Sequence, residues 1–217
     1  MGIVRFQISI SVDGFVAGPR QSEENPLGVG GLALHEWVFE LEAWRTWQGL
    51  DGGVVNASTP TIEEARANVG ATIMGRNMFG GGPGRWRESP PWEGWWGEEP
   101  PFHTPVFVLT HHPREPLEMK GGTTFVFVTD GIESALARAT EAAGGMDVVL
   151  GGGASLIRQF LAAGLVDEFE LHLVPILLGD GARLFDDVRR LPVEQVRVID
   201  APGVVHLKYR IPEGAGA

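Results

Sequence analysis

Leu150-Gly151-Gly152-Gly153-Ala154-Ser155-Leu156 decides the fold of this chain, because an apolar run ends there and a helical pattern begins. The run Val148–Leu150 predicts a buried strand, and the helical pattern continues until Gly164 ends it. Unpaired amides at the start of such a helix can face an anion, and glycine lets a phosphate approach the backbone. The segment therefore predicts a pyrophosphate site, with a tight turn that binds no ligand as the alternative. It is not a Rossmann fingerprint, since Leu156 stands where the third glycine would, and no Walker lysine follows.

Upstream, the sequence predicts a strand, a mobile loop and two helices. Residues 4–12 alternate apolar and polar side chains as a strand does, and Asp13-Gly14 supplies a turn. Apolar residues at helical spacing from Leu34 to Trp44 predict a helix of about four turns. A second helix is expected near Ile62–Val69, closed by a glycine.

Strands and helices alternate in the middle of the chain, and strands alone follow. The middle contains three β-rich runs and a helical stripe that ends at Gly144-Gly145. After residue 168 the alternating runs have no helix between them, which favours antiparallel strands. We therefore expect an α/β fold with roughly eight strands, four helices and a mostly parallel sheet. Residues 1–212 would form one domain and residues 213–217 a flexible tail.

Composition excludes several classes of function. The net charge of −11 disfavours nucleic acid and anionic membranes as partners, because both are recognised through clustered Lys and Arg. No run resembles a signal peptide or reaches transmembrane length, and the chain has no cysteine for disulfides or thiolate zinc sites. We therefore expect a cytoplasmic protein. Because its net charge is negative, any anionic cofactor would be bound by local groups, such as a helix N-terminus and one or two arginines.

Four blocks resemble the dihydrofolate-reductase-like superfamily, in the branch similar to the reductase domain of riboflavin biosynthesis. They occur in the family's order: Ser11-Val12-Asp13-Gly14-Phe15-Val16-Ala17-Gly18, Met74-Gly75-Arg76-Asn77-Met78-Phe79, the triple-glycine segment, and residues 167–185. The resemblance implies a three-layer fold, a homodimer and an NADPH-dependent reductase. It also implies a cis peptide bond at Gly151-Gly152.

The resemblance assigns cofactor residues. Gly75, Arg76 and Asn77 would begin a helix beside the cofactor, and Arg76 would contact the 2′-phosphate of NADPH. The alternative for Arg76 is a surface residue paired with a carboxylate. Thr110 and His111 would line the adenosine half, and the segment Gly151–Leu156 would hold the pyrophosphate. Met78 stands where the family often has a hydroxyl, so that contact is lost or replaced.

The substrate side is assigned by the same resemblance. Ser9, Val16 and Ala17 would bind the nicotinamide carboxamide, and Asp13 and Glu36 are candidate catalytic carboxylates. For these two, a turn cap and a solvated side chain are the alternatives. The segment His35-Glu36-Trp37 does not match a folate-enzyme motif, although His35 and Trp37 are candidate substrate contacts.

A long region, Gly80–Pro105, has no periodicity and is rich in Gly, Pro and Trp. Its aromatic residues, with Trp95 as a candidate substrate contact, would roof the substrate pocket or form a subunit interface. His111 and His112 are adjacent, but neighbours in an extended segment point to opposite faces, and no other ligand stands at a suitable spacing. We therefore expect no metal.

Three functions remain open. The leading hypothesis is an NADPH-dependent reductase that transfers a hydride to a small heterocyclic acceptor resembling a pterin, pyrimidine or flavin precursor. A second is the riboflavin-pathway 5-amino-6-(5-phosphoribosylamino)uracil reductase, although the usual deaminase partner domain is absent and no cysteine could form its zinc site. The third is a non-catalytic dimeric module that binds nucleotides.

Overall fold

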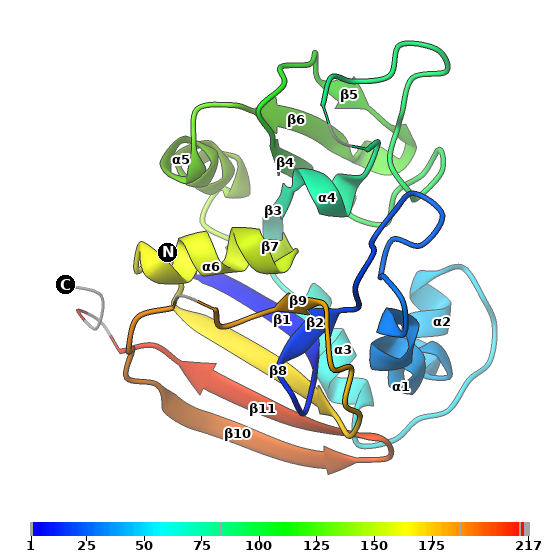
Figure 1. Ribbon diagram of the computed structural model, residues 1–217, viewed down its shortest axis with the longest axis vertical. Coiled ribbons are helices and arrows are strands. Elements are labelled where there is room, and N and C mark those ends of the chain that lie inside the picture. Colours follow the sequence, from blue (N-terminus) through cyan, green and yellow to red (C-terminus); the bar gives the residue numbers. More distant parts are fainter. Residues whose placement is uncertain (1, 83, 187, 213, 215–217) are drawn as a thin grey trace.

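The protein folds around a mixed β-sheet (Figure 1). The computed structural model describes residues 2–82, 84–186, 188–212 and 214, so the predicted tail lies outside the described residues except for Gly214. Within them, nine strands follow the order β10-β11-β8-β1-β7-β3-β4-β6-β5. Their bounds are β1 (Val4–Ser11), β3 (Val69–Gly75), β4 (Pro105–Leu109), β5 (Leu117–Glu118), β6 (Thr124–Val128), β7 (Asp147–Gly152), β8 (Glu168–Val174), β10 (Glu194–Ala201) and β11 (Val204–Arg210).

The strands from β8 to β6 pair in parallel, and the antiparallel strands lie at the two edges of the sheet. The parallel middle and antiparallel C-terminal strands are therefore confirmed. β11 and β10 form the C-terminal hairpin, and β5 joins the other edge. Sequence analysis missed β5 and the two-stranded sheet of β2 (Phe15–Ala17) and β9 (Ala182–Arg183). Strands this short are hard to predict because two or three residues cannot establish an alternation.

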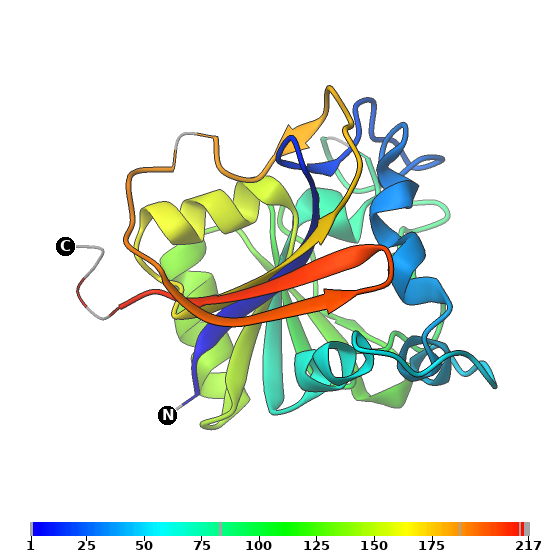
Figure 2. The same cartoon turned by 90° about the horizontal axis from the view of Figure 1, so that it is seen from below.

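Helices cover both faces of the sheet and give three layers (Figures 1 and 2). α5 (Ile132–Ala143) and α6 (Ala154–Ala162) bury their apolar stripes against one face. Three short helices and the Trp-rich segment before β4 lie on the opposite side, together with α4 (Arg76–Phe79). The short helices are α1 (Glu36–Phe39), α2 (Glu42–Trp47) and α3 (Thr59–Arg66), and the single-turn 3₁₀ helices are η1 (Gly31–His35) and η2 (Lys120–Gly122).

Two predicted helices differ from the structure. The four-turn helix from Leu34 is wrong, because η1, α1 and α2 replace it and Leu41 between them is extended. Leu34 and Leu41 are both fully buried, as one straight helix would also have placed them, but the chain is extended at Leu41. The second helix begins and ends earlier than predicted. Gly70 belongs to β3, where a Cβ atom would lie 2.6 Å from the carbonyl oxygen of Ala143.

The Trp-rich loop (residues 80–105 apart from 83) packs against the sheet instead of standing free. Trp86, Trp92, Trp96 and Phe102 contact a second apolar cluster formed by α4, β4 and β6. Trp86 and Trp92 donate their indole N–H groups to backbone carbonyls at 2.8 Å, so their polar atoms are satisfied. The loop therefore takes the place of a covering helix over this half of the sheet.

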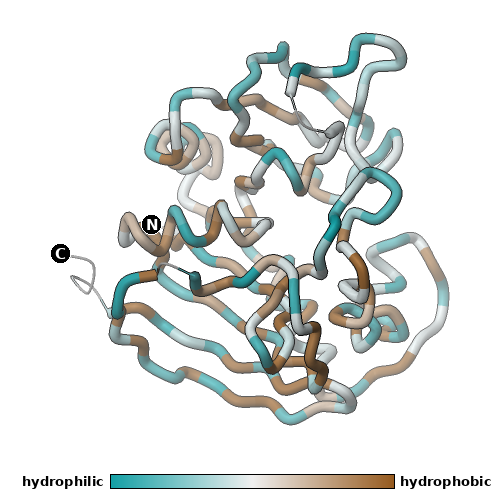
Figure 3. Tube along the Cα trace, in the orientation of Figure 1, coloured by the Kyte–Doolittle hydropathy of each residue, from teal (hydrophilic) through white to brown (hydrophobic). Residues whose placement is uncertain are grey.

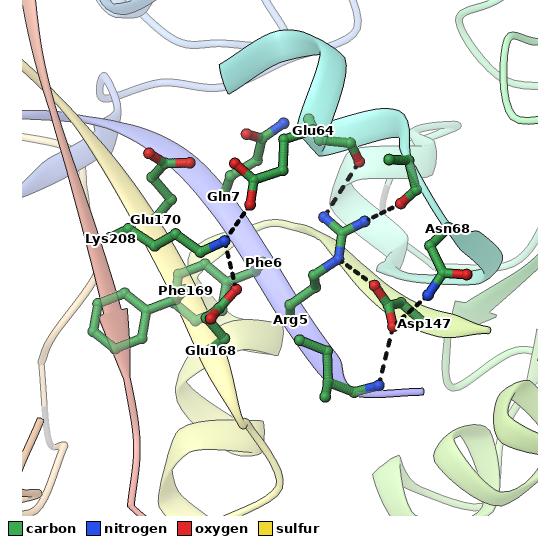
Figure 4. Close-up of a pocket in the computed structure, with 13 residues that line it drawn as sticks. Arg5, Phe6, Gln7, Glu64, Asn68, Asp147, Glu168, Phe169, Glu170 and Lys208 are labelled. Carbon is green, nitrogen blue, oxygen red and sulfur yellow. Dashed lines mark hydrogen bonds and ion pairs between the residues drawn. The ribbon is translucent and has the colours of Figure 1, made fainter. Parts of the chain in front are cut away.

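The polar side chains of β1, β8 and β11 are also covered, here by α3. Figure 3 shows the alternation along β8 and β11, and their polar positions face this helix. Lys208 pairs with Glu64 of α3 and with Glu168, while Arg5 bonds Asp147 at 2.9 Å (Figure 4). These groups line a cavity of about 300 Å³ at the N-terminal ends of β1, β7 and β8, whereas the glycine segment lies at the C-terminal end of β7.

Candidate functional site

Four neighbouring parallel strands bring most of the predicted cofactor residues to one edge of the sheet. β1, β7, β3 and β4 are adjacent, so their C-terminal ends meet along that edge. The glycine segment follows β7, Gly75 and Arg76 end β3 and begin α4, and Thr110 follows β4. In open α/β sheets such an edge is where ligands bind.

The start of α6 offers unused hydrogen-bond donors. The first helical bond from this turn runs from the Ile157 amide to the Gly153 carbonyl at 3.2 Å, and the amides of Ala154, Ser155 and Leu156 find no acceptor among the described residues. A Cβ atom at Gly153 would meet nothing within 4 Å, so space lies open beside the turn. Orphan amides and the helix dipole favour an anion there.

The cis peptide bond lies one residue later than predicted. It joins Gly152 to Gly153, whereas the resemblance placed it at Gly151-Gly152. β7 continues through Gly152, so the chain leaves the strand only at the following bond.

The end of β3 lies against the same turn. A Cβ atom at Gly75 would stand 3.7 Å from the Gly152 carbonyl oxygen and 3.9 Å from the Gly153 nitrogen. The Met78 sulfur lies 3.3 Å from where a Cβ atom of Gly151 would be, so Met78 fills the position of the missing hydroxyl with an apolar contact. Asn77 is exposed beside it.

Arg76 is held by the backbone of the Trp-rich loop. Its Nε donates to the Gly80 carbonyl at 3.0 Å, and its Nη2 donates to the carbonyls of Gly81 and Gly82 at 3.2 and 2.9 Å. Its guanidinium carbon lies 3.2 Å from the centre of the Trp86 ring. Burial, and then the charge of Arg114, lowers the pKa of Arg76. Of the guanidinium nitrogens, Nη1 has the weakest hydrogen bond, at 3.5 Å from the Thr110 hydroxyl.

Thr110 and His111 directly follow β4, whose last residue is Leu109. The Thr110 amide donates to the Val128 carbonyl at 3.0 Å, and its hydroxyl oxygen accepts from the His112 amide at 3.2 Å. Thr110 is buried and His111 is exposed. Over the described ranges, no group of three or more His, Cys, Asp or Glu side chains could hold a metal ion.

Asp13 clips the β1–β2 turn to the loop after β8. Its carboxylate accepts from the Ser11 hydroxyl at 2.5 Å and from the amides of Leu178 and Gly179 at 3.1 and 2.7 Å. The Ser11 bond, helped by these amides, lowers the pKa of Asp13 to about 2. A carboxylate that is ionised at neutral pH is a poor proton donor, so this arrangement suits positioning better than acid catalysis. Val16 and Ala17 of β2 are buried behind the turn.

The predicted substrate residues do not form one cluster. Trp37 donates its indole N–H to the buried Ser9 hydroxyl at 3.1 Å, which joins α1 to the centre of β1. The pKa of His35 is lowered by burial, and the exposed Glu36 side chain forms no hydrogen bond or ion pair with the described residues. Trp95 lies in the Trp-rich loop, where its ring meets Trp92 edge-on.

Sequence analysis missed a buried hydrogen-bonded chain beneath Trp37. His172 and His206 approach through their Nδ1 atoms at 2.8 Å, the His206 Nε2 lies 2.8 Å from the Ser58 hydroxyl, and the His172 Nε2 lies 3.2 Å from the Gln7 oxygen. Trp37 packs on both imidazoles, at 4.9 and 5.0 Å between ring centres. The alternation of β8 and β11 predicted two polar strand faces, but it did not indicate that α3 and Trp37 would bury them.

The edge of the sheet can therefore hold an elongated anionic ligand. Amides at the start of α6 would face its phosphates, and the Arg76 side of the edge would face a further negative charge. Ser9 and β2 border the other end, next to Trp37. Among the residues described, no helix has both the length and the apolar character needed to cross a membrane.

Solved structures share this fold. A putative riboflavin biosynthesis protein from Shewanella sp. PV-4 is 20% identical, with a TM-score of 0.61, and the alignment covers 97% of this chain and 99% of that one. A deaminase/5-amino-6-(5-phosphoribosylamino)uracil reductase from Thermotoga maritima is 15% identical with a TM-score of 0.57 over 97% of this chain but only 57% of that one. An Enterococcus faecalis dihydrofolate reductase complexed with NADP(H) is 14% identical with a TM-score of 0.52 over 98% of each chain. The expected dihydrofolate-reductase-like fold is confirmed.

Sequence comparison identifies the family. The uncharacterized protein YyaP of Bacillus subtilis (strain 168) is 46% identical over 68 residues, which are 30% of this chain and 36% of that protein. The sequence model of the RibD C-terminal domain matches residues 3–205. Because this match spans nearly the whole sequence, the chain belongs to the RibD C-terminal domain family.

Proposed function

We propose that this protein is an NADPH-dependent reductase that transfers a hydride to a small heterocyclic acceptor. Membership of the RibD C-terminal domain family and the dihydrofolate-reductase-like fold support an oxidoreductase of the riboflavin-pathway type. The observation that carries the cofactor assignment is the turn at Gly153, where free amides of α6 border open space. A dinucleotide supplies the negatively charged phosphates that such a turn binds.

Each part of the edge has a role in this proposal. The amides of Ala154, Ser155 and Leu156 would bind the pyrophosphate, Thr110 and His111 would border the adenosine, and Arg76 would face the 2′-phosphate. Ser9 and β2 would hold the carboxamide end of the nicotinamide. When bound there, NADPH supplies the hydride.

The residues around Trp37 would hold the acceptor. Trp37 is fixed by its bond to Ser9 and by contact with His172, so it offers a rigid aromatic wall next to β1. Asp13 keeps the β1–β2 turn in place as an ionised carboxylate. Glu36 is the exposed carboxylate on α1 that remains free to approach an acceptor, with His35 beside it. Trp95 would contact the acceptor only from the outer loop.

Substitution of Gly153 tests the cofactor site. The backbone φ of Gly153 is −83°, which alanine adopts readily, and its Cβ would meet nothing within 4 Å. Gly153→Val should therefore leave the melting temperature within about 4 °C of wild type, since the expected free-energy change is below roughly 1 kcal/mol. The branched side chain would occupy the space through which a phosphate approaches, so NADPH affinity by calorimetry should fall at least tenfold, about 1.4 kcal/mol. Equal NADPH affinity in both proteins would refute the assignment.

The acceptor class separates the two enzymatic hypotheses. Oxidation of NADPH at 340 nm would be followed with pterins, with flavin precursors and with 5-amino-6-(5-phosphoribosylamino)uracil. The RibD relationship favours the last of these as the second candidate substrate. NADPH binding without reduction of any of them would instead favour the non-catalytic module.

We also propose a homodimer. The rings of the Trp-rich loop pack on its own sheet, and exposed apolar side chains lie elsewhere, among them Val196 and Val198 on the edge strand β10 and Leu177 after β8. A second copy would cover them, and sedimentation equilibrium would show the dimer mass. A monomer at micromolar concentration would contradict this proposal.

A further inference from the structure

The cavity between α3 and the strands β1, β8 and β11 takes no part in the proposed function. Its volume of about 300 Å³ lies at the lower limit for ligand pockets and equals that of roughly ten water molecules. Five charged side chains line it on these elements (Figure 4): Arg5, Glu64, Glu168, Glu170 and Lys208. Such a lining suits a polar ligand, because burying charged groups against an apolar molecule is costly.

Negative charge exceeds positive charge around this cavity. The lining contains four carboxylates and two cations: Glu64, Asp147, Glu168 and Glu170 against Arg5 and Lys208. Arg197 supplies a third positive charge from outside the lining, through ion pairs with Glu64 at 2.7 Å and Glu170 at 3.1 Å. Arg210 stands 3.8 Å from Glu168 and is more than half exposed, so solvent screens its charge. Four carboxylates thus face three closely paired cations, which leaves one negative charge in excess.

Glu168 and Glu170 are the carboxylates with the fewest donors. Their side chains are only 12% and 8% exposed. The Lys208 ammonium lies 2.7 Å from one Glu168 oxygen, and both oxygens of Glu170 share one nitrogen of Arg197, at 3.1 and 3.4 Å. A carboxylate can accept about four hydrogen bonds, so both retain free acceptor positions. Asp147 already accepts three hydrogen bonds, so the free acceptors lie on β8.

Gln7 adds a hydrogen-bond donor beside these carboxylates. It lines the cavity from β1, and its position on the strand pairs with that of Glu170 on β8. Its side-chain oxygen accepts from the His172 Nε2 at 3.2 Å, whereas its amide nitrogen bonds none of the described residues. The two N–H groups of this amide are therefore available to an oxygen atom of a ligand.

We propose that this cavity binds a small organic ammonium ion through the carboxylates of Glu168 and Glu170, with Gln7 as the donor to a hydroxyl or carbonyl oxygen of the same molecule. A primary ammonium group supplies three N–H donors and one positive charge, which match the free acceptors and the excess negative charge. A metal ion does not fit, because no group of three or more suitable ligands in the described part of the chain could hold one. The site is independent of the proposed function, since the glycine segment lies at the opposite end of the strands.

Calorimetry with three probes at one ionic strength tests this proposal without any turnover. Ethanolamine carries both the charge and the N–H donors, ethylene glycol lacks the charge, and tetramethylammonium lacks the donors. Ethanolamine should bind at least tenfold more tightly than either of the others. Glu170→Gln should weaken ethanolamine binding at least tenfold, because the charge is lost while an oxygen remains for Arg197. Glu63→Gln is the matched control, since Glu63 is an exposed carboxylate of α3 outside the lining.

A second variant tests the same cavity by its shape. Ala65 lines the cavity from α3, so the larger side chain of Ala65→Leu would fill part of it while every charge stays in place. Ethanolamine affinity should again fall at least tenfold, which also covers the case in which Glu170→Gln is too unstable to measure. Urea denaturation checks that each variant is folded. The proposal is overturned if folded wild type shows no saturable ethanolamine binding, if the three probes bind equally, or if the folded variants bind ethanolamine as wild type does.

Discussion

Acidification should destabilise this protein through the buried pair His172 and His206. Burial lowers the pKa of His172 to about 3 and that of His206 to about 4, from an ordinary value of 6.5, and the neighbouring charges of His206 and Arg197 act in the same direction. The 2.8 Å contact between the two Nδ1 atoms also needs one bare nitrogen, so both rings cannot be charged together. The folded protein therefore keeps both histidines neutral.

The size of the effect follows from proton linkage. The unfolded chain binds protons near pH 6.5, whereas the folded chain does not until the pH approaches 4, so stability falls as pH drops through this window. Each ring contributes about 1.4 kcal/mol of lost stability per pH unit below 6.5. At pH 5 the loss is about 2 kcal/mol per ring and about 4 kcal/mol for the pair, equivalent to roughly 8–16 °C in melting temperature for a domain of this size. Above pH 7 the pair contributes no further change in the free energy of unfolding.

Urea denaturation at pH 7, 6 and 5, at constant ionic strength, measures this slope directly. His172→Gln should lower the slope by the contribution of one ring, whatever it does to stability at pH 7, and His111→Gln, at an exposed histidine, is the matched control. Burial also lowers the pKa of His35, which adds to the wild-type slope and is common to all three proteins. A flat profile between pH 7 and 5, or the same slope in His172→Gln, would refute the linkage argument.

Two further substitutions test how the two ends of β1 are held. Asp13→Asn should speed hydrogen exchange at the Gly179 amide at pH 7, because the carboxylate that holds this amide is lost. In the wild type, acid should have the same effect only near pH 2, because the pKa of Asp13 is lowered to about 2. Unchanged exchange in Asp13→Asn would exclude this role of the Asp13 carboxylate. Arg5→Lys should lower the free energy of unfolding by about 2 kcal/mol in urea, since lysine cannot bond Asp147 and the carbonyls of Ala65 and Ala67 together. An unchanged urea midpoint would contradict this.

Sequence periodicity predicted the sheet well because most of the long strands bury at least one face, with β10 as the exception. The parallel order of β7, β3 and β4 also explains why three distant blocks, which the resemblance assigned to one cofactor, lie along one edge. Sequence periodicity gave a wrong prediction for residues 34–49, because the spacing of the buried leucines fits several short helices as well as one long helix. Apolar spacing shows which residues are buried, but it does not show whether the chain bends between them.

The buried polar residues were beyond sequence analysis for a different reason. His172 and Glu170 occupy the polar positions of β8, and such positions usually face water. Here they are buried, with Arg197 paired to Glu170 at 3.1 Å and burial raising the pKa of Glu170. Only the path of α3, which depends on the segment between α2 and α3, decides that this face is covered.

The Trp-rich loop links the stability of the core to the properties of the candidate site. Its rings close the apolar cluster over β4 and β6, and its first carbonyls fix the guanidinium of Arg76. Arg114 lies against the same Trp86 ring and bonds the Trp92 carbonyl. Packing of this loop therefore determines where Arg76 and Arg114 lie relative to the free amides of α6. Guanidinium groups and free amides both bind anions, which matters in a chain whose net charge is −11. A substitution that loosens the loop should consequently weaken selection between nucleotides before it unfolds the sheet, because the sheet has a second and larger core on its other face.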